Sequence, residues 1–197
     1  MTVHDVRIEV TPLQTEGMRD VRGDVVRRQL IADHGVDVGI VRSICGYLIR
    51  SQYDASSIAP RVQDIFSDPI IEFGAVDTPV IHDSNFFPQT PPLCVTIGFK
   101  PGVTDNPGAA ANDGFQVLFP DVSAAISTYT TYVFTDLPET VDNVWLASTL
   151  HNPLIERAIL VTRDNLSSGN DSLITFPDRP TIVRQSPSII DLEVANE

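Results

Sequence analysis

The stretch SDPIIEF at residues 67–73 has a counterpart in HNPLIER at residues 151–157. In both, an Asp or Asn precedes a proline, which is followed by two aliphatic residues and a glutamate. A shared pattern of this kind within one short chain indicates internal duplication, which has to be recognised before a fold is assigned. The match extends outward from this stretch, so the sequence predicts two similar units.

Two further segments carry the match toward the beginning of each unit. VRIEVTP from Val6 aligns with VTIGFKP from Val95, and GMRDVRG from Gly17 aligns with GVTDNPG from Gly102. The first copy has four additional residues, LQTE, before its glycine. Beyond that insertion the two copies stay in register at an offset of 85 residues, and of 84 at the proline signature.

Each unit begins with a strand, a glycine turn and a helix. Apolar residues alternate with polar ones in the first segment, which is typical of a strand. Asp20 in the first copy, and Asp105 or Asn106 in the second, are candidate helix caps, because a short polar side chain accepts backbone N–H groups there. Gly23 and Gly108 are small enough to let the start of each helix lie close to the sheet.

A long central strand follows, over about residues 37–51 and 122–135, rich in β-branched and aromatic residues. Tyr47 and Tyr132 occupy matching positions in it. A second helix and a third strand complete each unit, which therefore reads β-α-β-α-β. Residues on the inner faces of the predicted helices should be buried: Val26, Leu30, Ile65, Phe66, Phe115 and Trp145.

The duplicated proline signature is interpreted as a structural boundary between a helix and an extended segment. A residue before proline is disfavoured in a helix, so Asp68 and Asn152 should end the second helix, and Pro69 and Pro153 should begin an extended run. The alternative is a catalytic polar pair, of Asp68 with Glu72 or of Asn152 with Glu156. It is disfavoured because the second copy lacks the first carboxylate, which paired acid–base chemistry would need.

The expected organisation is a first unit with the start of a linker at 1–84, a second unit at 85–163 and an extended tail at 164–197. The proline-rich segment TPVIHDSNFFPQTPP links the units, and we expect Phe86 and Phe87 to pack onto one of them. The stretch DNLSSGNDS, which follows Arg163, is predicted to be a loop.

Charge and composition exclude some classes of function. The net charge is −13, with a single lysine, so nucleic acid is not an expected partner because its phosphates need a basic surface. No apolar run approaches the roughly 20 residues of a membrane span, and the beginning of the sequence lacks the features of a signal peptide. A cytoplasmic protein is expected, with Cys45 and Cys94 as reduced packing residues.

The ordered motifs VTIGFKPGVTDNPG, a strand centred on a tyrosine, and NPLIE resemble the PurS family of phosphoribosylformylglycinamidine (FGAM) synthase. The resemblance covers residues 5 to about 163, in both units. It implies an α+β fold in which two tandem ferredoxin-like units form a pseudo-dimer, with a continuous antiparallel sheet covered by helices. The tail sequence SIIDLEVAN resembles a join to a PurL-type catalytic region.

The same resemblance implies a non-catalytic assembly role in purine biosynthesis. PurS joins the PurL synthetase to the PurQ glutaminase and supports ammonia transfer. ATP and magnesium would belong to the PurL partner region, with no cofactor in this chain. One departure is clear: the family often has Gly-Lys-Tyr in the central strand, whereas this chain has Cys45-Gly46-Tyr47 in one copy and Thr130-Thr131-Tyr132 in the other.

The sequence contains few recognisable motifs for catalysis or for binding a metal or cofactor. The four histidines are scattered without metal-ligand spacing, and no dinucleotide, phosphate-loop or zinc-protease motif occurs. The turns at Gly17 and Gly102 are candidates for cradling a phosphate, but Asp20 and Asp105 at the helix starts would repel an anion, so capping is preferred. The main alternative function is a stand-alone ferredoxin-like module that binds or senses a small molecule. An enzyme in its own right is disfavoured.

Overall fold

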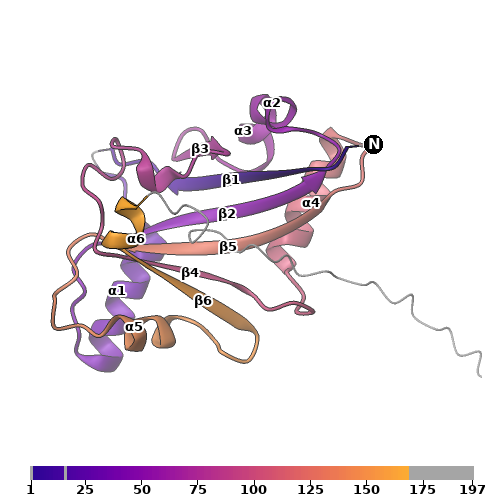
Figure 1. The fold of residues 1–197 in the computed structure, drawn as a ribbon. Coiled ribbons are helices and arrows are strands. Elements are labelled where there is room, and N and C mark those ends of the chain that lie inside the picture. Colours follow the sequence, from indigo (N-terminus) through magenta and orange to yellow (C-terminus); the bar gives the residue numbers. More distant parts are fainter. Residues whose placement is uncertain (1, 16, 169–197) are drawn as a thin grey trace, which may run out of the picture.

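The computed structural model describes residues 2–15 and 17–168, which form an α+β structure on one six-stranded antiparallel sheet (Figure 1). The strands are β1 (His4–Pro12), β2 (Val41–Ser51), β3 (Glu72–Val76), β4 (Leu93–Phe99), β5 (Ala125–Phe134) and β6 (Glu156–Thr162). Their order across the sheet is β3-β1-β2-β5-β4-β6. From either edge, the third strand of one half is followed by the first and then the second.

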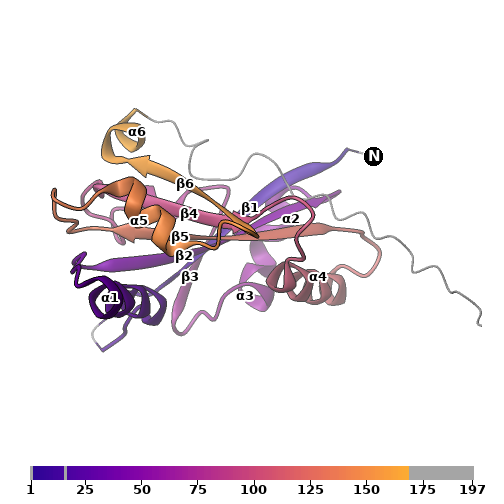
Figure 2. The same cartoon turned by 90° about the horizontal axis from the view of Figure 1, so that it is seen from below.

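Most helices cover one face of this sheet. They are α1 (Val21–His34), α2 (Ala55–Ile58), α3 (Val62–Ile65), α4 (Asn106–Leu118), α5 (Asn143–Leu150) and α6 (Arg163–Ser167), with 3-10 turns η1 (Ala59–Arg61) and η2 (Val80–His82). Figure 2 shows α1, α3 and α4 on one side of the sheet and α6 on the other. Within the described ranges, no helix combines the length and apolar character needed to cross a membrane.

The centre of the sheet is the pairing of β2 with β5. It comprises ten facing pairs, from Val41 with Phe134 to Arg50 with Ala125. In the middle, Cys45 faces Thr130, and these two residues differ by the same 85 positions that relate the two halves of the sequence. If each residue is replaced by its counterpart 85 positions away in the other half, the same facing pairs result. The Cys45–Thr130 pair is the centre of this symmetry.

The outer pairings correct the alignment of the first strands. Ile8 faces Tyr47, and Val95 faces Tyr132, so Ile8 rather than Val6 is the counterpart of Val95. The sequence pattern could not reveal this difference, because residues two positions apart in a strand point to the same face of the sheet.

The helix-covered face holds two apolar clusters. Val26 and Leu30 of α1 pack with β4 and α5 in one cluster, whereas Phe66 and Phe115 pack with β1 in the other. All four of these side chains are buried, as predicted. Ile65, also predicted to be buried, is only half-buried.

Helix α5 differs from its prediction. The Asp142 carboxylate accepts a 2.6 Å hydrogen bond from the Trp145 N–H, so the helix begins at Asn143 and turns Leu146 and Ala147 into the core. Trp145 is therefore half-buried, and its ring meets that of His34 edge-on at 5.2 Å.

The opposite face of the sheet is covered by the linker and by α6. Phe86 and Phe87 are buried, as expected, but they pack in a cluster with Ile44 of β2 and Val133 of β5, so they contact both halves rather than one. Leu166 of α6 belongs to the same cluster. The sheet is thus covered on both faces.

Helix α6 replaces the loop that the sequence predicts after Arg163. The Asn165 amide oxygen accepts hydrogen bonds from the Thr162 N–H at 3.1 Å and from the Thr162 hydroxyl at 2.8 Å. This local cap, together with burial of Leu166, stabilises a turn of helix in a polar stretch. The rest of the predicted tail, residues 169–197, lies outside the described residues.

A buried glutamate connects the first strand to the second half. Glu9 is 1% exposed, and its two oxygens accept hydrogen bonds from the Tyr129 hydroxyl at 2.8 Å and the Val80 N–H at 2.7 Å. The Tyr129 ring crosses Gly46 to reach it, so closely that a Cβ on Gly46 would lie 1.9 Å from the ring. Burial, together with the nearby Glu9, raises the pKa of the Tyr129 hydroxyl well above 10.

We predict that Gly46→Ala lowers the free energy of unfolding by about 1–3 kcal/mol, because the new methyl group must displace the Tyr129 ring from Glu9. Gly114→Ala in α4 is the matched control. Its methyl group would meet only the Ile65 Cγ2 methyl, at 3.2 Å, which needs a shift of a few tenths of an ångström, and alanine favours a helix by about 0.5–1 kcal/mol over glycine, so the change should cost clearly less than Gly46→Ala. Chemical denaturation measures both; a Gly46→Ala protein as stable as the parent would contradict the described packing.

Candidate functional site

A carboxylate fixes α1 to the central strand of the first half. The Asp20 Oδ1 atom accepts hydrogen bonds from the Gly23 N–H and the Ser43 hydroxyl, both at 2.8 Å. Its Oδ2 atom accepts the Ser43 N–H at 2.5 Å. Pairing of β1 with β2 ends at Val10 and Cys45, so the carboxylate serves an N–H of β2 beyond the last paired residue of β1.

The second half contains the same arrangement. Asp105 Oδ1 accepts hydrogen bonds from the Gly108 N–H at 2.7 Å and the Thr128 hydroxyl at 2.9 Å, and Oδ2 accepts the Thr128 N–H at 2.6 Å. Every partner lies 85 positions after its counterpart in the first half. We call these two arrangements the Asp20 clamp and the Asp105 clamp.

Glycine is needed where each helix meets the sheet. A Cβ on Gly23 would lie 2.0 Å from the Val41 carbonyl oxygen, and one on Gly108 would lie 2.8 Å from both the Ile126 carbonyl oxygen and the Asp105 carboxylate. The predicted close approach of helix to sheet is confirmed.

The preceding turns also match. Gly17 and Gly102 have φ angles of 87° and 85°, a left-handed conformation that glycine adopts readily. Asp20 and Asp105 are buried, with both oxygens of each carboxylate used as caps. The capping interpretation is therefore confirmed, and an anion at these helix amides would have to displace a carboxylate.

The two tyrosines lie opposite the clamps across the β2–β5 pairing. Tyr47 faces Thr128 of the Asp105 clamp, and Tyr132 faces Ser43 of the Asp20 clamp. Both rings are half-buried on the helix side, where burial raises the pKa of each hydroxyl, while Arg22 acts in the opposite direction. The predicted residues of both halves thus meet around one central region.

Two cavities flank this centre. One, of about 260 Å³, is lined by residues that include Arg22, Cys45 and Glu72. The other, of about 190 Å³, is lined at the corresponding positions by Pro107, Thr130 and Glu156. The cavities have matching places in the two halves but different chemistry.

The cysteines offer little nucleophilic character. The Arg22 guanidinium donates a hydrogen bond to the Cys45 sulfur, yet burial outweighs this cation and raises the pKa of the thiol. Burial raises the pKa of Cys94 to about 12. Both are therefore thiols at neutral pH, whereas the thiolate is the reactive form. Among the described residues, no group of three or more His, Cys, Asp or Glu side chains is placed to hold a metal ion.

The duplicated proline signature forms the same turn in both halves. The Asp68 N–H donates to Glu72 Oε2 at 3.0 Å, and the Asn152 N–H donates to Glu156 Oε2 at 2.7 Å. Each turn ends where β3 or β6 begins, at the glutamate, so the prolines open a turn rather than the predicted extended run. These polar side chains cap the turns.

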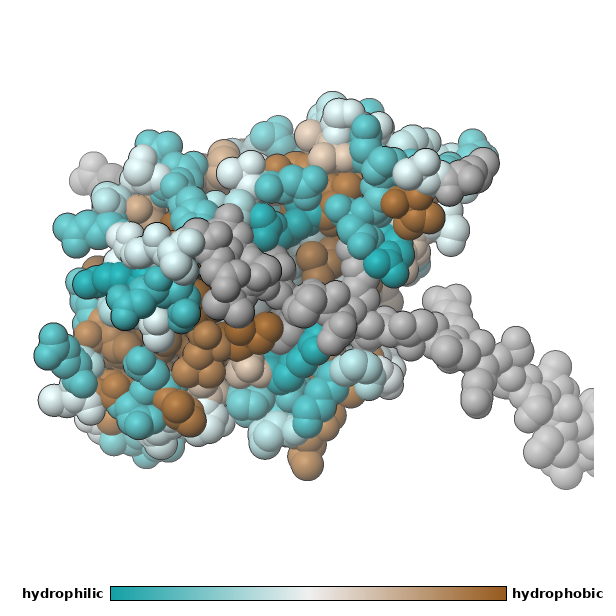
Figure 3. Space-filling view, viewed as in Figure 1, coloured by the Kyte–Doolittle hydropathy of each residue, from teal (hydrophilic) through white to brown (hydrophobic). Residues whose placement is uncertain are grey.

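Each of these turns also exposes aliphatic side chains. Ile70 is 74% exposed in the first turn, and Leu154 is 83% exposed in the second. Figure 3 shows hydrophilic residues interspersed with smaller hydrophobic areas over the visible face. The two halves therefore each expose an aliphatic side chain at the equivalent turn.

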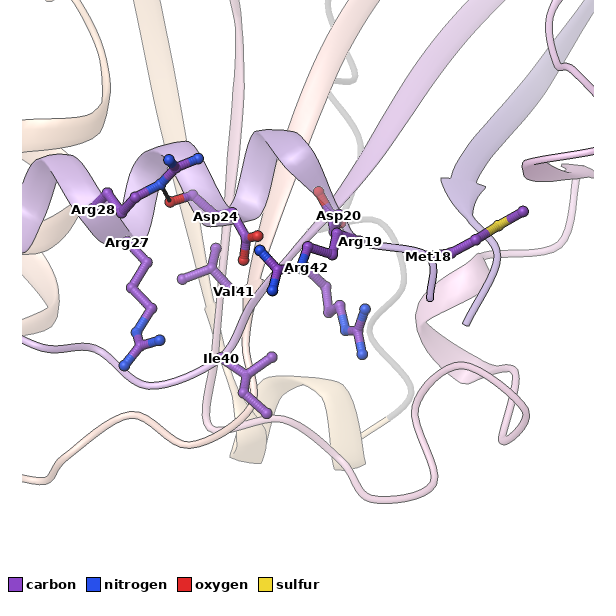
Figure 4. Close-up of a pocket in the computed structure, with 9 residues that line it drawn as sticks. All are labelled: Met18, Arg19, Asp20, Asp24, Arg27, Arg28, Ile40, Val41 and Arg42. Atoms are coloured by element: carbon purple, nitrogen blue, oxygen red, sulfur yellow. Dashed lines mark hydrogen bonds between the residues drawn. The ribbon is translucent and has the colours of Figure 1, made fainter. Parts of the chain in front are cut away.

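A further cavity, of about 420 Å³, was not predicted from the sequence. Four arginines line it: Arg19, Arg27, Arg28 and Arg42. In Figure 4 these side chains come from α1, from the segment just before it and from the start of β2. The pattern RDVRGDVVRR contains basic residues near a helix start, but the tertiary fold is what places Arg42 at the same cavity.

Comparison with models of known protein families finds no match, and comparison with the sequences of curated proteins finds none either.

We predict that Asp20→Ala and Asp105→Ala each lower the free energy of unfolding by about 2–4 kcal/mol, because each removes a helix cap and leaves a sheet N–H without its partner. Asp54→Ala is the control. Asp54 caps α2 through a 3.0 Å bond from the Ser57 N–H, but it is exposed and serves no strand, so its loss should be clearly smaller. Equal losses in urea denaturation for all three variants would contradict the clamp.

Proposed function

We propose that the chain is a tandem pair of PurS-like units and serves as a non-catalytic assembly domain of FGAM synthase. In this proposal it joins a PurL-type synthetase to a PurQ-type glutaminase and supports the transfer of ammonia between them. ATP and magnesium would be used by the synthetase partner. The observation that carries the proposal is the β2–β5 register, centred on Cys45 and Thr130.

The register supports a covalent counterpart of a PurS dimer. A twofold axis through the middle of two antiparallel strands requires that each residue at the centre face its own equivalent, as Cys45 and Thr130 do. The strand order and the two aspartate clamps have the same symmetry. Together they match the implied arrangement of two units with one continuous sheet.

The chemistry of the central region supports an assembly role over a catalytic one. Its thiol is kept protonated at neutral pH by burial, and its carboxylates Asp20 and Asp105 serve as structural caps. In contrast, the exposed aliphatic groups at Ile70 and Leu154 are held on rigid, self-bonded turns, which lowers the entropic cost of using them as contacts. We assign these turns to contact with the synthetase.

A small-molecule-binding module is the second candidate function. The central cavities, at about 260 and 190 Å³, fall below the ~300 Å³ lower limit of typical ligand sites, so they do not favour a metabolite between the halves. The arginine-lined cavity of about 420 Å³ lies within the usual range and does favour a ligand, in the first half of the chain.

The functional test uses purified synthetase and glutaminase of the source organism, assayed with and without this chain. Synthesis of formylglycinamidine ribonucleotide is measured with glutamine and, separately, with ammonium salt. We predict that omitting the chain reduces the glutamine-dependent rate at least as much as the ammonia-dependent rate, because added ammonia bypasses transfer between sites. An unchanged glutamine-dependent rate would contradict the proposal.

A variant of the exposed turns tests the proposed contact directly. When both Ile70 and Leu154 are replaced with aspartate, the chain should lose most of its ability to raise the glutamine-dependent rate, because contact with the synthetase is weakened. The thermal stability of the chain should stay unaltered. Val117→Asp is the matched control, because Val117 is 79% exposed on α4, away from the turns. Full stimulation by the double variant would exclude these turns as the contact.

A further inference from the structure

The arginine-lined cavity lies where α1 begins beside the start of β2 (Figure 4). Its lining includes four arginines but only two carboxylates, those of Asp20 and Asp24. The cavity is therefore locally cationic in a chain whose net charge is −13. Such a local field attracts anions against the average charge of the surface.

The charges in the cavity are not equally available to a ligand. Arg27 forms a double hydrogen bond with Asp37, at 2.8 and 2.7 Å, and this bond lowers the pKa of Asp37 to about 2, so the pair stays ionised and mutually neutralised at neutral pH. Asp20 is committed to the clamp. Within the described ranges, Arg19 and Arg42 form no ion pair.

The second half of the chain offers an internal comparison. It repeats the Asp20 clamp bond for bond. At the positions 85 residues after the four arginines it has Thr104, Asn112, Asp113 and Ser127. A clamp of this kind therefore does not need the arginines. The bonds to Asp37 and to the Asp24 carbonyl account for Arg27 and Arg28, but not for Arg19 and Arg42.

We propose that this cavity binds a small phosphate monoester that carries hydroxyl groups, with Arg19 and Arg42 holding the phosphate. The planar guanidinium donates paired N–H groups that match phosphate oxygens, and a phosphate dianion balances two such cations. Because the Asp20 carboxylate already accepts the Gly23 N–H at the start of α1, we assign recognition to side chains rather than to the helix backbone.

The volume and the remaining lining define the organic part of the ligand. A bare phosphate would leave most of about 420 Å³ unfilled, whereas this size is typical of sites for small organic ligands. Ile40 is 50% exposed at the cavity and offers an apolar contact. Asp24 supplies a carboxylate that accepts hydrogen bonds from hydroxyl groups. This inference does not depend on an assembly role, and the two are tested separately.

The test is calorimetric titration of the full chain with ribose 5-phosphate and with glycerol 3-phosphate, and in parallel with inorganic phosphate and with ribose. We expect at least one monoester to bind with a Kd below 1 mM, at least tenfold more tightly than inorganic phosphate or ribose. Failure of both monoesters to bind overturns the proposal. Binding no tighter than that of inorganic phosphate overturns the organic part of the site.

Matched variants locate the binding. The double change Arg19→Gln and Arg42→Gln should weaken the monoester at least tenfold, whereas Arg50→Gln, at the other end of β2, should leave its Kd within twofold. Both variants replace exposed or half-buried side chains, and circular dichroism verifies that they fold. Equal binding by the double variant and the parent would show that these arginines are not the site, whatever the outcome of the assembly assay.

Discussion

The pairing of β2 with β5 is the constraint on which the remaining structure depends. These ten facing pairs are the junction between the two halves in the sheet. Since side chains alternate between faces, this register places Cys45 and Tyr47 on the helix side together with Thr130 and Tyr132. A slip of one residue would turn one whole set away from the helices and separate each tyrosine from the clamp opposite it.

The two clamps fix the helices relative to the paired central strands. Each carboxylate joins a helix start to an N–H of a central strand, so the positions of α1 and α4 are fixed by the same strands that pair with one another. Around this shared frame the two halves differ. Tyr129 crosses Gly46 to reach Glu9 on one side only, because its equivalent in the first half is Ile44, and the arginine-lined cavity lies in the first half.

Much of this arrangement follows from local chemistry and was predictable. The caps at Asp20 and Asp105, the close glycines Gly23 and Gly108, and the matching of Tyr47 with Tyr132 each depend on a few neighbouring residues.

The two-residue error in the alignment of the first strands arose because the alternation of polar and apolar residues does not change when a strand is shifted by two. In α5 the fully buried residues are Leu146 and Ala147, and Trp145 packs against the same cluster from its edge. Contacts between segments that lie far apart in the chain could not be predicted from the sequence. Glu9 reads as the polar member of an alternating strand, but it is buried because Tyr129 and the Val80 N–H, both far along the chain, supply its hydrogen bonds. The arginine cavity likewise needs the start of β2 beside α1.

The central claim, the symmetric register of β2 with β5, is tested most directly by introducing one cysteine. Facing residues in an antiparallel pair have Cα atoms about 4.5–5.5 Å apart, within the range that a disulfide spans. Under mild oxidation, Thr130→Cys should form a disulfide with Cys45, identified by peptide mapping, whereas Ser127→Cys, which faces Leu48, should not. Free thiols in an oxidised Thr130→Cys protein that remains folded would contradict the register and, with it, the twofold arrangement of the sheet.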